Sequence, residues 1–464
     1  MDTNRRSFIR NMGLALAATG LAADNIVRAS SLASSENLFV TNRAHPEPAL
    51  IGYDRLPLAW YKATVQRLKD KLNGIEAILL ESDQNKVYFS GCFRNSGERT
   101  TWVLFPTKEK DTAYWYAPAI DRDLITSWWC TELEYYFCFP HTEGGFPNKG
   151  QVVKGPAKDI FEWMLEGLRK RGFNGKTIGI DKSLSPSQLA VAKKVLPDSK
   201  FVSIYEECLQ MHVIKTREEI ALCQRAYRYF DKVHAFARDF ILEHGTTVTD
   251  FEIGQALQAF AIRLIMNDVK YDGRPHTAVG IDSTSHYVRA GVSTAYPHPN
   301  QFFYSKVKKG EPLYVNTDIK LGGMGGEGYR NYLIAPWTQL QNKMWEVVAE
   351  TVQIMVEESR PGVMCSEVAY KVHQHQVKSG MQNHIYHRPG HGTGQNDEGH
   401  QAPFLALGDS TVIEEGMMFS VEPGLYDASN GIGINPSDNL LITKNGAVLM
   451  SRIPFSKEWS YLTL

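Results

Sequence analysis

The chain has 464 residues, of which 43% are hydrophobic and 22% are charged, and its formal net charge at pH 7 is −1. This length is enough for two domains with separate hydrophobic cores. The balanced charge provides no electrostatic attraction to nucleic acid or to an anionic membrane, so we expect neither as a partner.

Residues 1–30 have the pattern of an export signal. Paired arginines at positions 5 and 6 precede Ser-Phe-Ile, a short apolar run and small residues that offer cleavage sites. The run is too short to span a bilayer and resembles a twin-arginine signal, which is an address and not an anchor. We therefore expect a soluble periplasmic protein, with a disordered basic tail as the alternative. In that oxidising compartment Cys130 and Cys138 either pair or remain as core thiols.

Residues 45–210 alternate between helical and strand patterns. Apolar residues at helical spacing predict helices over residues 60–72 and 159–170. Apolar runs predict strands over residues 75–80, 86–91, 101–106, 113–116, 177–180 and 201–204. This alternation predicts an α/β domain.

A second domain is predicted over residues 211–464. Thr216 and Glu219 have the spacing of a helix capping box, and the apolar positions that follow keep helical spacing as far as Ile241. A long helix should therefore open this domain.

The chemistry of the chain is concentrated near its carboxyl end. His391 lies between two glycines in Pro-Gly-His-Gly-Thr-Gly, and His400 follows in Gly-His-Gln-Ala-Pro. An apolar strand over residues 417–421 delivers Glu422 at its end. Two imidazoles and a carboxylate can handle a metal ion or a proton. For either histidine alone, a solvated turn residue is the alternative.

The sequences PGHGTG, GHQAP and GMMFSVEPGLY resemble the last third of the pita-bread metallopeptidases. That superfamily includes aminopeptidase P, prolidase, methionine aminopeptidase and the metal-free creatinase. The resemblance implies an α/β (α+β) protein in which a creatinase-type amino-terminal domain precedes a pita-bread catalytic domain. In the family the first domain caps a neighbouring subunit's active site, which implies a homodimer.

The resemblance also implies a ligand set. Hydrolytic members hold two divalent ions with two Asp, one His and two Glu. If Arg330 takes the place of the family arginine, Glu327 takes the second Asp and Asn316 the first. The last glutamate corresponds to Asn435 or to Asp438, depending on where a gap falls.

These substitutions change the expected metal site. Glu327, His391 and Glu422 remain as ligands, and Asp438 is a further candidate. Asp318 is another, since it projects to the same face of a strand as Asn316. Because neutral Asn316 replaces a carboxylate, we expect one ion of manganese, iron, cobalt or zinc in preference to two. The alternative is no ion at all, as in creatinase, which has Asn-Thr at this place.

Four further residues receive roles from the resemblance. His286 corresponds to the histidine that donates a proton to the leaving nitrogen, and His400 to the one that binds the carbonyl or the tetrahedral intermediate. Arg330 would hold the carboxylate of Glu327 in position without itself binding the ion. Arg94 is a candidate clamp for a substrate carboxylate. The alternatives are a core imidazole for His286 and a solvated arginine for Arg94.

The expected activity is hydrolysis of a C–N bond in a small peptide or amino-acid-derived substrate, in the manner of an Xaa-Pro aminopeptidase or dipeptidase. Three alternatives stay open. They are a metal-independent, creatinase-like amidinohydrolase, a lyase of the type that cleaves dimethylsulfoniopropionate, and a binding protein of the same fold without catalysis.

Overall fold

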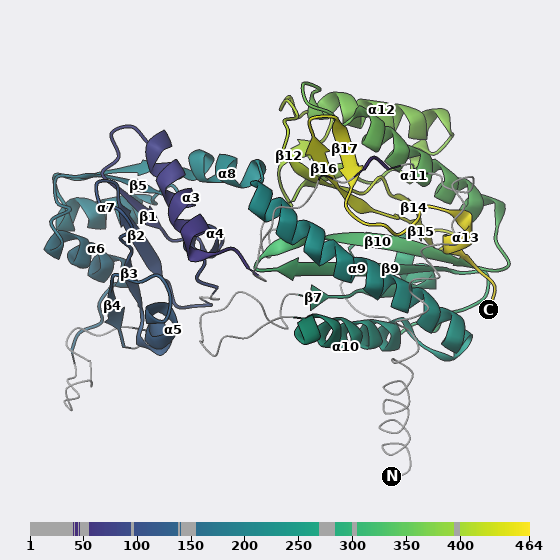
Figure 1. The fold of residues 1–464 in the computed structure, drawn as a ribbon, viewed down its shortest axis with the longest axis horizontal. Coiled ribbons are helices and arrows are strands. Elements are labelled where there is room, and N and C mark those ends of the chain that lie inside the picture. The colour runs from purple at the N-terminus through teal and green to yellow at the C-terminus, as the bar shows by residue number, and fades with distance from the viewer. Residues whose placement is uncertain are drawn as a thin grey trace, which may run out of the picture.

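The computed structural model describes residues 55–93, 97–137, 155–268, 284–298, 304–393 and 400–464, together with residues 40, 42–44, 46 and 140. Figure 1 shows two lobes, an amino-terminal domain in purple to blue and a carboxy-terminal domain in teal to yellow. The predicted order of an α/β domain followed by a second α/β unit is confirmed. Residues 1–30, Arg94 and Cys138 lie outside the described residues.

The amino-terminal domain is organised around one six-stranded mixed sheet, in the order β4-β3-β2-β1-β5-β6. Its strands are β1 (Ala77–Leu80), β2 (Trp102–Pro106), β3 (Tyr114–Pro118), β4 (Glu132–Tyr136), β5 (Thr177–Ile180) and β6 (Lys200–Ser203). Alternate residues of β1 enter different cores, since Ile78 and Leu80 pack with α3 (Leu58–Lys71) while Ala77 and Leu79 pack with α6 (Ile160–Lys170). Helices therefore cover both faces of this sheet.

One predicted strand of this domain is wrong. Residues 86–91 belong to a helix, α4 (Asp83–Ser90), and not to a strand. Ser82 accepts a hydrogen bond from the backbone N–H of Asn85 at its start, and Gly91 ends it in the left-handed conformation at φ 73°. These capping residues outweigh the strand preference of the apolar residues between them.

The two domains meet where α8 (Tyr205–Val213) passes into α9 (Arg217–His244). The predicted capping box is present, because Thr216 and Glu219 exchange side-chain and backbone hydrogen bonds at the start of α9. Trp60 of the first domain donates its indole N–H to Thr216 at 3.1 Å. Apolar side chains of α3, α8 and α9 form one continuous core, so the domains are packed together at this joint.

The carboxy-terminal domain contains two main sheets. The first has the order β18-β10-β9-β7, with β8 also paired to β9. It consists of β7 (Thr284–Ser285), β8 (Val288–Ala290), β9 (Pro312–Leu321), β10 (Met324–Ile334) and β18 (Tyr461–Leu462). The second has the order β12-β11-β13-β16-β17. It consists of β11 (Gly390–Gly392), β12 (Gln401–Leu405), β13 (Met418–Val421), β16 (Asp438–Thr443) and β17 (Gly446–Leu449), and a ribbon of β14 (Leu425–Asp427) and β15 (Ile432–Ile434) lies beside it.

Helices cover the outer faces of these sheets (Figure 1). Helices α9 and α10 (Asp250–Asp268) pack on the first sheet, and α11 (Gln339–Glu358) and α12 (Cys365–Lys378) on the second. The remaining helices are α5 (Arg122–Thr126), α7 (Pro186–Val195), α13 (Lys457–Ser460) and the short 3₁₀ turns η2 (Ala119–Asp121), η4 (Gly245–Thr247), η6 (Gly291–Ala295) and η7 (Gln382–His384). Strand β10 touches β13 and β16, so the two sheets meet at the middle of the domain. Among the described residues, no helix is both long and apolar enough to cross a membrane.

A short segment before the first domain packs on the second one. Asn42 exchanges hydrogen bonds with the backbone of Leu449 on β17, and Arg43 donates to the carbonyls of Val356 and Ala447. Pro46 accepts a hydrogen bond from Gln224 of α9. The described residues from 40 to 46 are therefore held on the carboxy-terminal domain.

Candidate metal centre

One wall of the candidate site is the hairpin of β9 and β10. Asp318 pairs directly with Glu327, and Asn316 pairs with Tyr329. Because side chains of a strand alternate between its faces, these four residues project from the same face of the hairpin. The Tyr329 hydroxyl donates a hydrogen bond to Glu327 Oε2 at 2.8 Å and fixes the direction of that carboxylate.

The facing wall comes from β11 and β13. His391 pairs with Ser420, and Glu422 follows two residues later, just past the end of β13. His391 Nε2 lies 2.8 Å from Glu422 Oε1, which also accepts a hydrogen bond from the Ser420 hydroxyl at 2.9 Å. The predicted strand before Glu422 is therefore present, and period-two spacing explains why Ser420 and Glu422 meet.

The two walls bring four ligating side chains together. Glu327, His391, His400 and Glu422 each offer an atom, and these atoms all lie within 4.8 Å of one another. The rings of His391 and His400 stack with centroids 3.9 Å apart, and Glu327 Oε1 lies 3.9 Å from His391 Nε2. We call this set the four-residue cluster. Three of its members are predicted ligands, and His400, predicted to contact substrate, joins them.

His391 is oriented by contacts at both of its ring nitrogens. Nδ1 lies 3.1 Å from the carbonyl oxygen of Gly392, and Nε2 faces Glu422. Burial acts to lower the pKa of His391, but the contact with Glu422 outweighs burial and raises it. With Nδ1–H donated to the carbonyl, a divalent cation can replace the proton on Nε2.

The two carboxyl groups of the cluster differ in acidity. Burial and the negative charge of Glu422 raise the pKa of Glu327. Burial also acts to raise the pKa of Glu422, but the hydrogen bond and positive charge of His391 outweigh it and lower that pKa. The site thus pairs a carboxylate that stays ionised with a carboxyl that can exchange a proton, which is the pattern that acid–base chemistry requires.

Several buried oxygens around the cluster have no hydrogen-bond partner within the described residues. They are Glu327 Oε1, Asn316 Oδ1, Asp318 Oδ1 and Asn435 Oδ1. Buried polar atoms in folded proteins are almost always paired, so a group of unpaired acceptors indicates a place prepared for a cation or a donor. All four atoms are acceptors, which favours a cation.

The cluster fits one divalent ion. Bonds of about 2.0–2.2 Å hold ligand atoms up to about 4.4 Å apart, so the four atoms need to approach only slightly to surround an ion. Two carboxylates and two imidazoles suit manganese, iron, cobalt or zinc. A second ion has fewer charged ligands, because Asn316 and Asn435 are neutral.

Asp318 and Asn435 lie beside the cluster without being part of it. Asp318 Oδ2 is held by the Lys320 ammonium at 3.0 Å, and its other oxygen is unpaired. Asn435 follows β15 directly, and its backbone N–H donates to Asn331 Oδ1 at 2.7 Å. A Cβ added to Gly424, two residues after Glu422, would lie 2.9 Å from Asn435 Cγ, so Asn435 is packed against the Glu422 loop.

Arg330 and Asp438 are placed differently from the prediction. Arg330 does not brace Glu327; its Nη2 lies 2.9 Å from Asp438 Oδ2, and both side chains are buried. Asp438 accepts further hydrogen bonds from the backbone N–H groups of Asn439 and Ser451 and from the Ser451 hydroxyl. Its oxygens are therefore occupied by protein donors, and Asp438 is not available as a metal ligand.

His286 is also placed away from the cluster. Its Nδ1 lies 3.3 Å from the hydroxyl of Thr317, and Thr317 leaves β9 on the opposite face from Asn316 and Asp318. Burial lowers the pKa of His286 to about 4. In this structure His286 is a buried core imidazole, which was the alternative to its predicted role as a proton donor. Arg94 lies outside the described residues.

Two supporting residues escaped the sequence analysis. Tyr329 and Ser420 each lie two positions from a cluster member on a strand, so both face the site and hydrogen-bond to its carboxylates. Period-two spacing around Glu327 and Glu422 is the signal that could have found them.

Two family models match this chain. The one described as Metallopeptidase family M24 matches residues 221–444, and the one described as Creatinase/Prolidase N-terminal domain matches residues 62–214. Together they cover most of both domains.

Curated relatives agree with these matches. The chain is 25% identical over 380 residues to an Xaa-Pro dipeptidase of Pyrococcus horikoshii, covering 82% of this chain and 93% of the relative. It is 26% identical over 329 residues to a putative dipeptidase of Bacillus subtilis, covering 70% and 85%.

Solved structures share the fold. Dipeptidase PepE of Mycobacterium ulcerans matches with a TM-score of 0.67 at 18% identity, over 88% of this chain and all of that one. The amino-terminal domain of a FACT complex subunit from chickpea matches with a TM-score of 0.64 at 12% identity, over 87% of this chain and 99% of that one. Since this fold occurs in dipeptidases and in a FACT subunit, function must be argued from the site.

Proposed function

The chain belongs to metallopeptidase family M24, and on that basis we propose that it is a metal-dependent hydrolase of small peptides with an Xaa-Pro bond. Relatives that carry the name Xaa-Pro dipeptidase support the substrate class. The observation that carries the proposal is the four-residue cluster, in which two carboxylates and two imidazoles converge beside a buried, unpaired Glu327 oxygen.

We infer one bound divalent ion, held by Glu327, His391, His400 and Glu422. When bound, such an ion supplies a Lewis acid that polarises a carbonyl and lowers the pKa of water. Manganese, iron, cobalt and zinc all suit this donor set. Asn316 and Asn435 would stand beside the ion as neutral oxygen donors, and they are the reason that we propose one ion instead of two.

The residues of the cluster divide the work of hydrolysis. Glu422 stays ionised because the Ser420 hydroxyl donates to Oε1 and a positive charge would face it in both states, from His391 in the metal-free site and from the ion in the loaded one. In the metal-free site the raised pKa of Glu327 lets it hold a proton at Oε1, and a bound ion would take the place of that proton, while the Tyr329 hydroxyl holds Oε2. His400 is the more exposed of the two histidines and can donate to a substrate oxygen or to the leaving nitrogen.

Release of proline from an Xaa-Pro dipeptide tests the proposal. We expect turnover by the metal-loaded protein, its loss with a chelator, and its return when metal is added back. Glu422→Gln should lower kcat/KM by more than about a hundredfold, because it removes a charged ligand. Glu415→Gln, an exposed change in the loop before β13, is the matched control. Wild-type turnover in Glu422→Gln would reject the site.

One observation favours a second candidate, a metal-independent amidinohydrolase. His391 and Glu422 already form a direct hydrogen bond, and neutral asparagine stands at positions 316 and 435. In that reaction Glu422 and His391 would move protons without an ion. Turnover of a guanidino acid by chelator-treated protein, with none of an Xaa-Pro dipeptide, would establish this candidate in place of the first.

We also propose that the protein is exported to the periplasm and acts as a homodimer. The paired arginines and apolar run of residues 1–30 support export. The match to the creatinase-type amino-terminal domain over residues 62–214 supports the dimer. Fractionation of cells with a periplasmic marker tests the first proposal, and light scattering on the purified protein tests the second. A cytoplasmic or monomeric protein would contradict them.

A further inference from the structure

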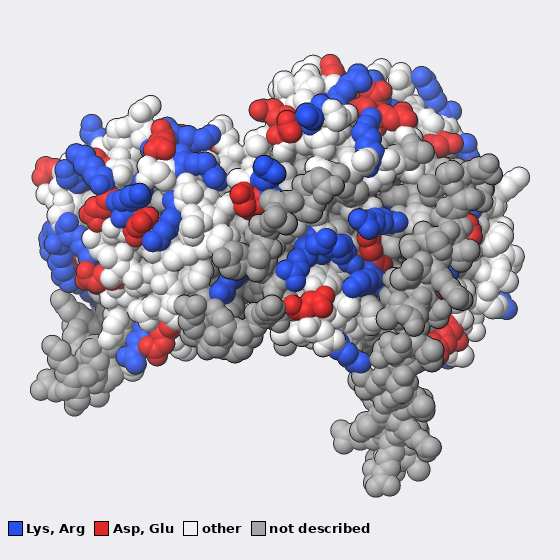
Figure 2. All heavy atoms as spheres, in the orientation of Figure 1, with Lys and Arg blue, Asp and Glu red and all other residues white. Residues whose placement is uncertain are grey.

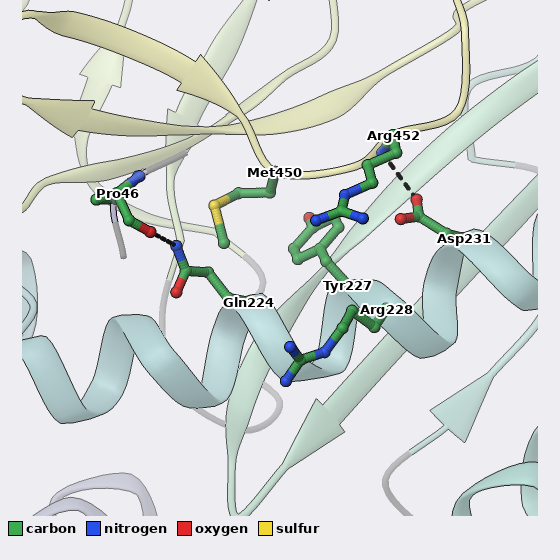
Figure 3. Close-up of a pocket in the computed structure, with 7 residues that line it drawn as sticks. All are labelled: Pro46, Gln224, Tyr227, Arg228, Asp231, Met450 and Arg452. Carbon is green, nitrogen blue, oxygen red and sulfur yellow. Dashed lines mark hydrogen bonds between the residues drawn. The ribbon is translucent and has the colours of Figure 1, made fainter. Parts of the chain in front are cut away.

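A small cavity lies beside α9, and no residue of the four-residue cluster lines it. Its volume is about 80 Å³, and it is lined by Pro46, Gln224, Tyr227, Arg228, Asp231, Met450 and Arg452. Figure 3 shows that these residues come from α9, from the loop after β17 and from the segment near residue 46. The cavity is thus formed where three parts of the chain meet, and the cluster does not use it.

Two cationic side chains line this cavity, and the charge of one of them, Arg452, acts on the carboxyl group of Asp231. Arg228 and Arg452 are both exposed, and neither guanidinium has a hydrogen-bond or ion-pair partner within the described residues. Figure 2 shows that basic side chains gather on the face that carries α9. Planar guanidinium groups bind carboxylates in a bidentate manner, so the pair suits a small carboxylate.

One unpaired acceptor and one buried carboxyl group line the same cavity. Gln224 donates its amide N–H to the Pro46 carbonyl at 2.9 Å, while its Oε1 is buried without a donor. Asp231 Oδ1 accepts from the backbone N–H of Arg452 at 2.8 Å (Figure 3), and burial raises the pKa of Asp231 to about 7. The lining is therefore complementary to a ligand that carries both a hydrogen-bond donor and an anionic group.

The size and the apolar wall restrict the ligand further. Met450 is buried, and the aromatic ring of Tyr227 lies beside it in the lining. At about 10–15 Å³ for each water-sized group, the volume holds roughly five to eight non-hydrogen atoms. This is the size of a small amino acid.

We propose that this cavity binds a free α-amino acid with a small side chain. Its carboxylate would bind Arg228 and Arg452, its ammonium group would donate to Gln224 Oε1, and its side chain would lie against Met450. The ligand class follows from the lining and is independent of the proposed peptidase activity.

The cavity shares a residue with the back of the metal centre. The Tyr227 hydroxyl donates to the backbone carbonyl of Glu327 at 3.1 Å and also to Asn439 Oδ1. Gly326 permits this contact, because a Cβ there would lie 1.8 Å from Asn439 Oδ1. Only the Tyr227 side chain therefore separates the proposed ligand from the main chain of a cluster residue.

Methyl NMR tests the proposal at the cavity itself. The chain is labelled with methyl-¹³C methionine, and the Met450 signal is assigned among the 13 methionines with Met450→Leu. Glycine is the probe. We expect the Met450 signal to shift and saturate, while acetate binds more weakly and methylammonium causes no saturable shift. Met450 is the one methionine among the seven lining residues, so binding of glycine elsewhere does not produce this result.

Arginine variants give the matched comparison. Arg228→Gln and Arg452→Gln should each weaken glycine binding by about tenfold, the loss expected for one charge-assisted hydrogen bond. Arg263→Gln changes an exposed helical arginine outside the cavity and should leave binding unchanged. Unaltered signals of the other methionines show that the variants are folded. A Met450 signal that glycine does not shift, or that shifts equally in the Arg452→Gln protein, would overturn the proposal.

Discussion

Two buried polar groups lie on either side of strand β10, and they are built differently. On one face Arg330 meets Asp438, whose oxygens accept four hydrogen bonds from protein donors. On the other face Glu327 stands among acceptors that have no donor within the described residues. A buried carboxylate whose oxygens all accept hydrogen bonds from protein donors stabilises the fold. A buried carboxylate with an unpaired oxygen requires a ligand to occupy that oxygen. Hydrogen-bond satisfaction thus separates the structural carboxylate from the functional one.

The satisfied pair should matter most for stability. Asp438→Asn leaves the buried Arg330 charge uncompensated, and we expect the free energy of unfolding to fall by about 3–5 kcal/mol. Chemical denaturation measures this loss. The exposed pair of Arg122 and Asp123 is the control, since Asp123→Asn should cost no more than about 1 kcal/mol. Equal effects of the two changes would remove the contrast.

The affinity of the four-residue cluster for metal should depend on the hydrogen bond that Tyr329 donates to Glu327. Tyr329→Phe removes the donor to Glu327 Oε2 and should weaken metal binding by about 10–100-fold with little change in unfolding. A competition assay with a metal-binding dye measures the affinity. Tyr314→Phe is the control, because the Tyr314 ring packs 5.0 Å from that of Tyr329 without a hydrogen bond to Glu327. An unchanged affinity in Tyr329→Phe would contradict the role of Tyr329.

A carboxylate at position 316, in place of the neutral asparagine, should increase the affinity of the cluster for metal. Asn316→Asp adds a carboxylate near that of Glu327, on a face that already carries Asp318, so metal affinity should rise by about tenfold, or ~1.4 kcal/mol. Without metal the variant should unfold more easily than the wild type, because the two carboxylates then repel each other. Lower affinity for metal in Asn316→Asp would show that residue 316 does not face the ion.

The smallest effect on metal binding is expected from a change at His286. Its imidazole lies on the far face of β9, against Thr317, so His286→Ala should leave metal content unchanged. Unfolding should become easier by about 1–3 kcal/mol because a buried side chain is lost. If metal binding falls in this variant as far as it does in Glu422→Gln, His286 belongs to the site after all.

Features set by neighbouring residues could be predicted from the sequence. The capping box at Thr216 and Glu219 depends on three-residue spacing, and Glu422 at the end of an apolar strand depends on period two. Both were found. Helix α4 was missed because its N-cap, Ser82, lies before the predicted strand of residues 86–91, and because Gly91 was taken as the end of that strand and not as a helix cap.

Features set by distant residues could not be predicted. Asp438 and Glu327 are both carboxylates on strands, and only the fold brings Arg330 to the first and His391 to the second. The face on which His286 lies depends on its packing beside β9, which local spacing does not determine. The sequence therefore predicted Glu327, His391 and Glu422 as ligands, assigned His400 to the substrate, and also gave a ligand role to the structural carboxylate of Asp438.

Elemental mass spectrometry on protein purified without chelator tests the central claim most directly. The four-residue cluster predicts about one divalent ion per chain in the wild type and in His286→Ala, and less than about a tenth of that in Glu422→Gln. A wild-type chain with less than about a tenth of an equivalent, not raised by added manganese, iron, cobalt or zinc, would contradict the assignment of the cluster as a metal centre.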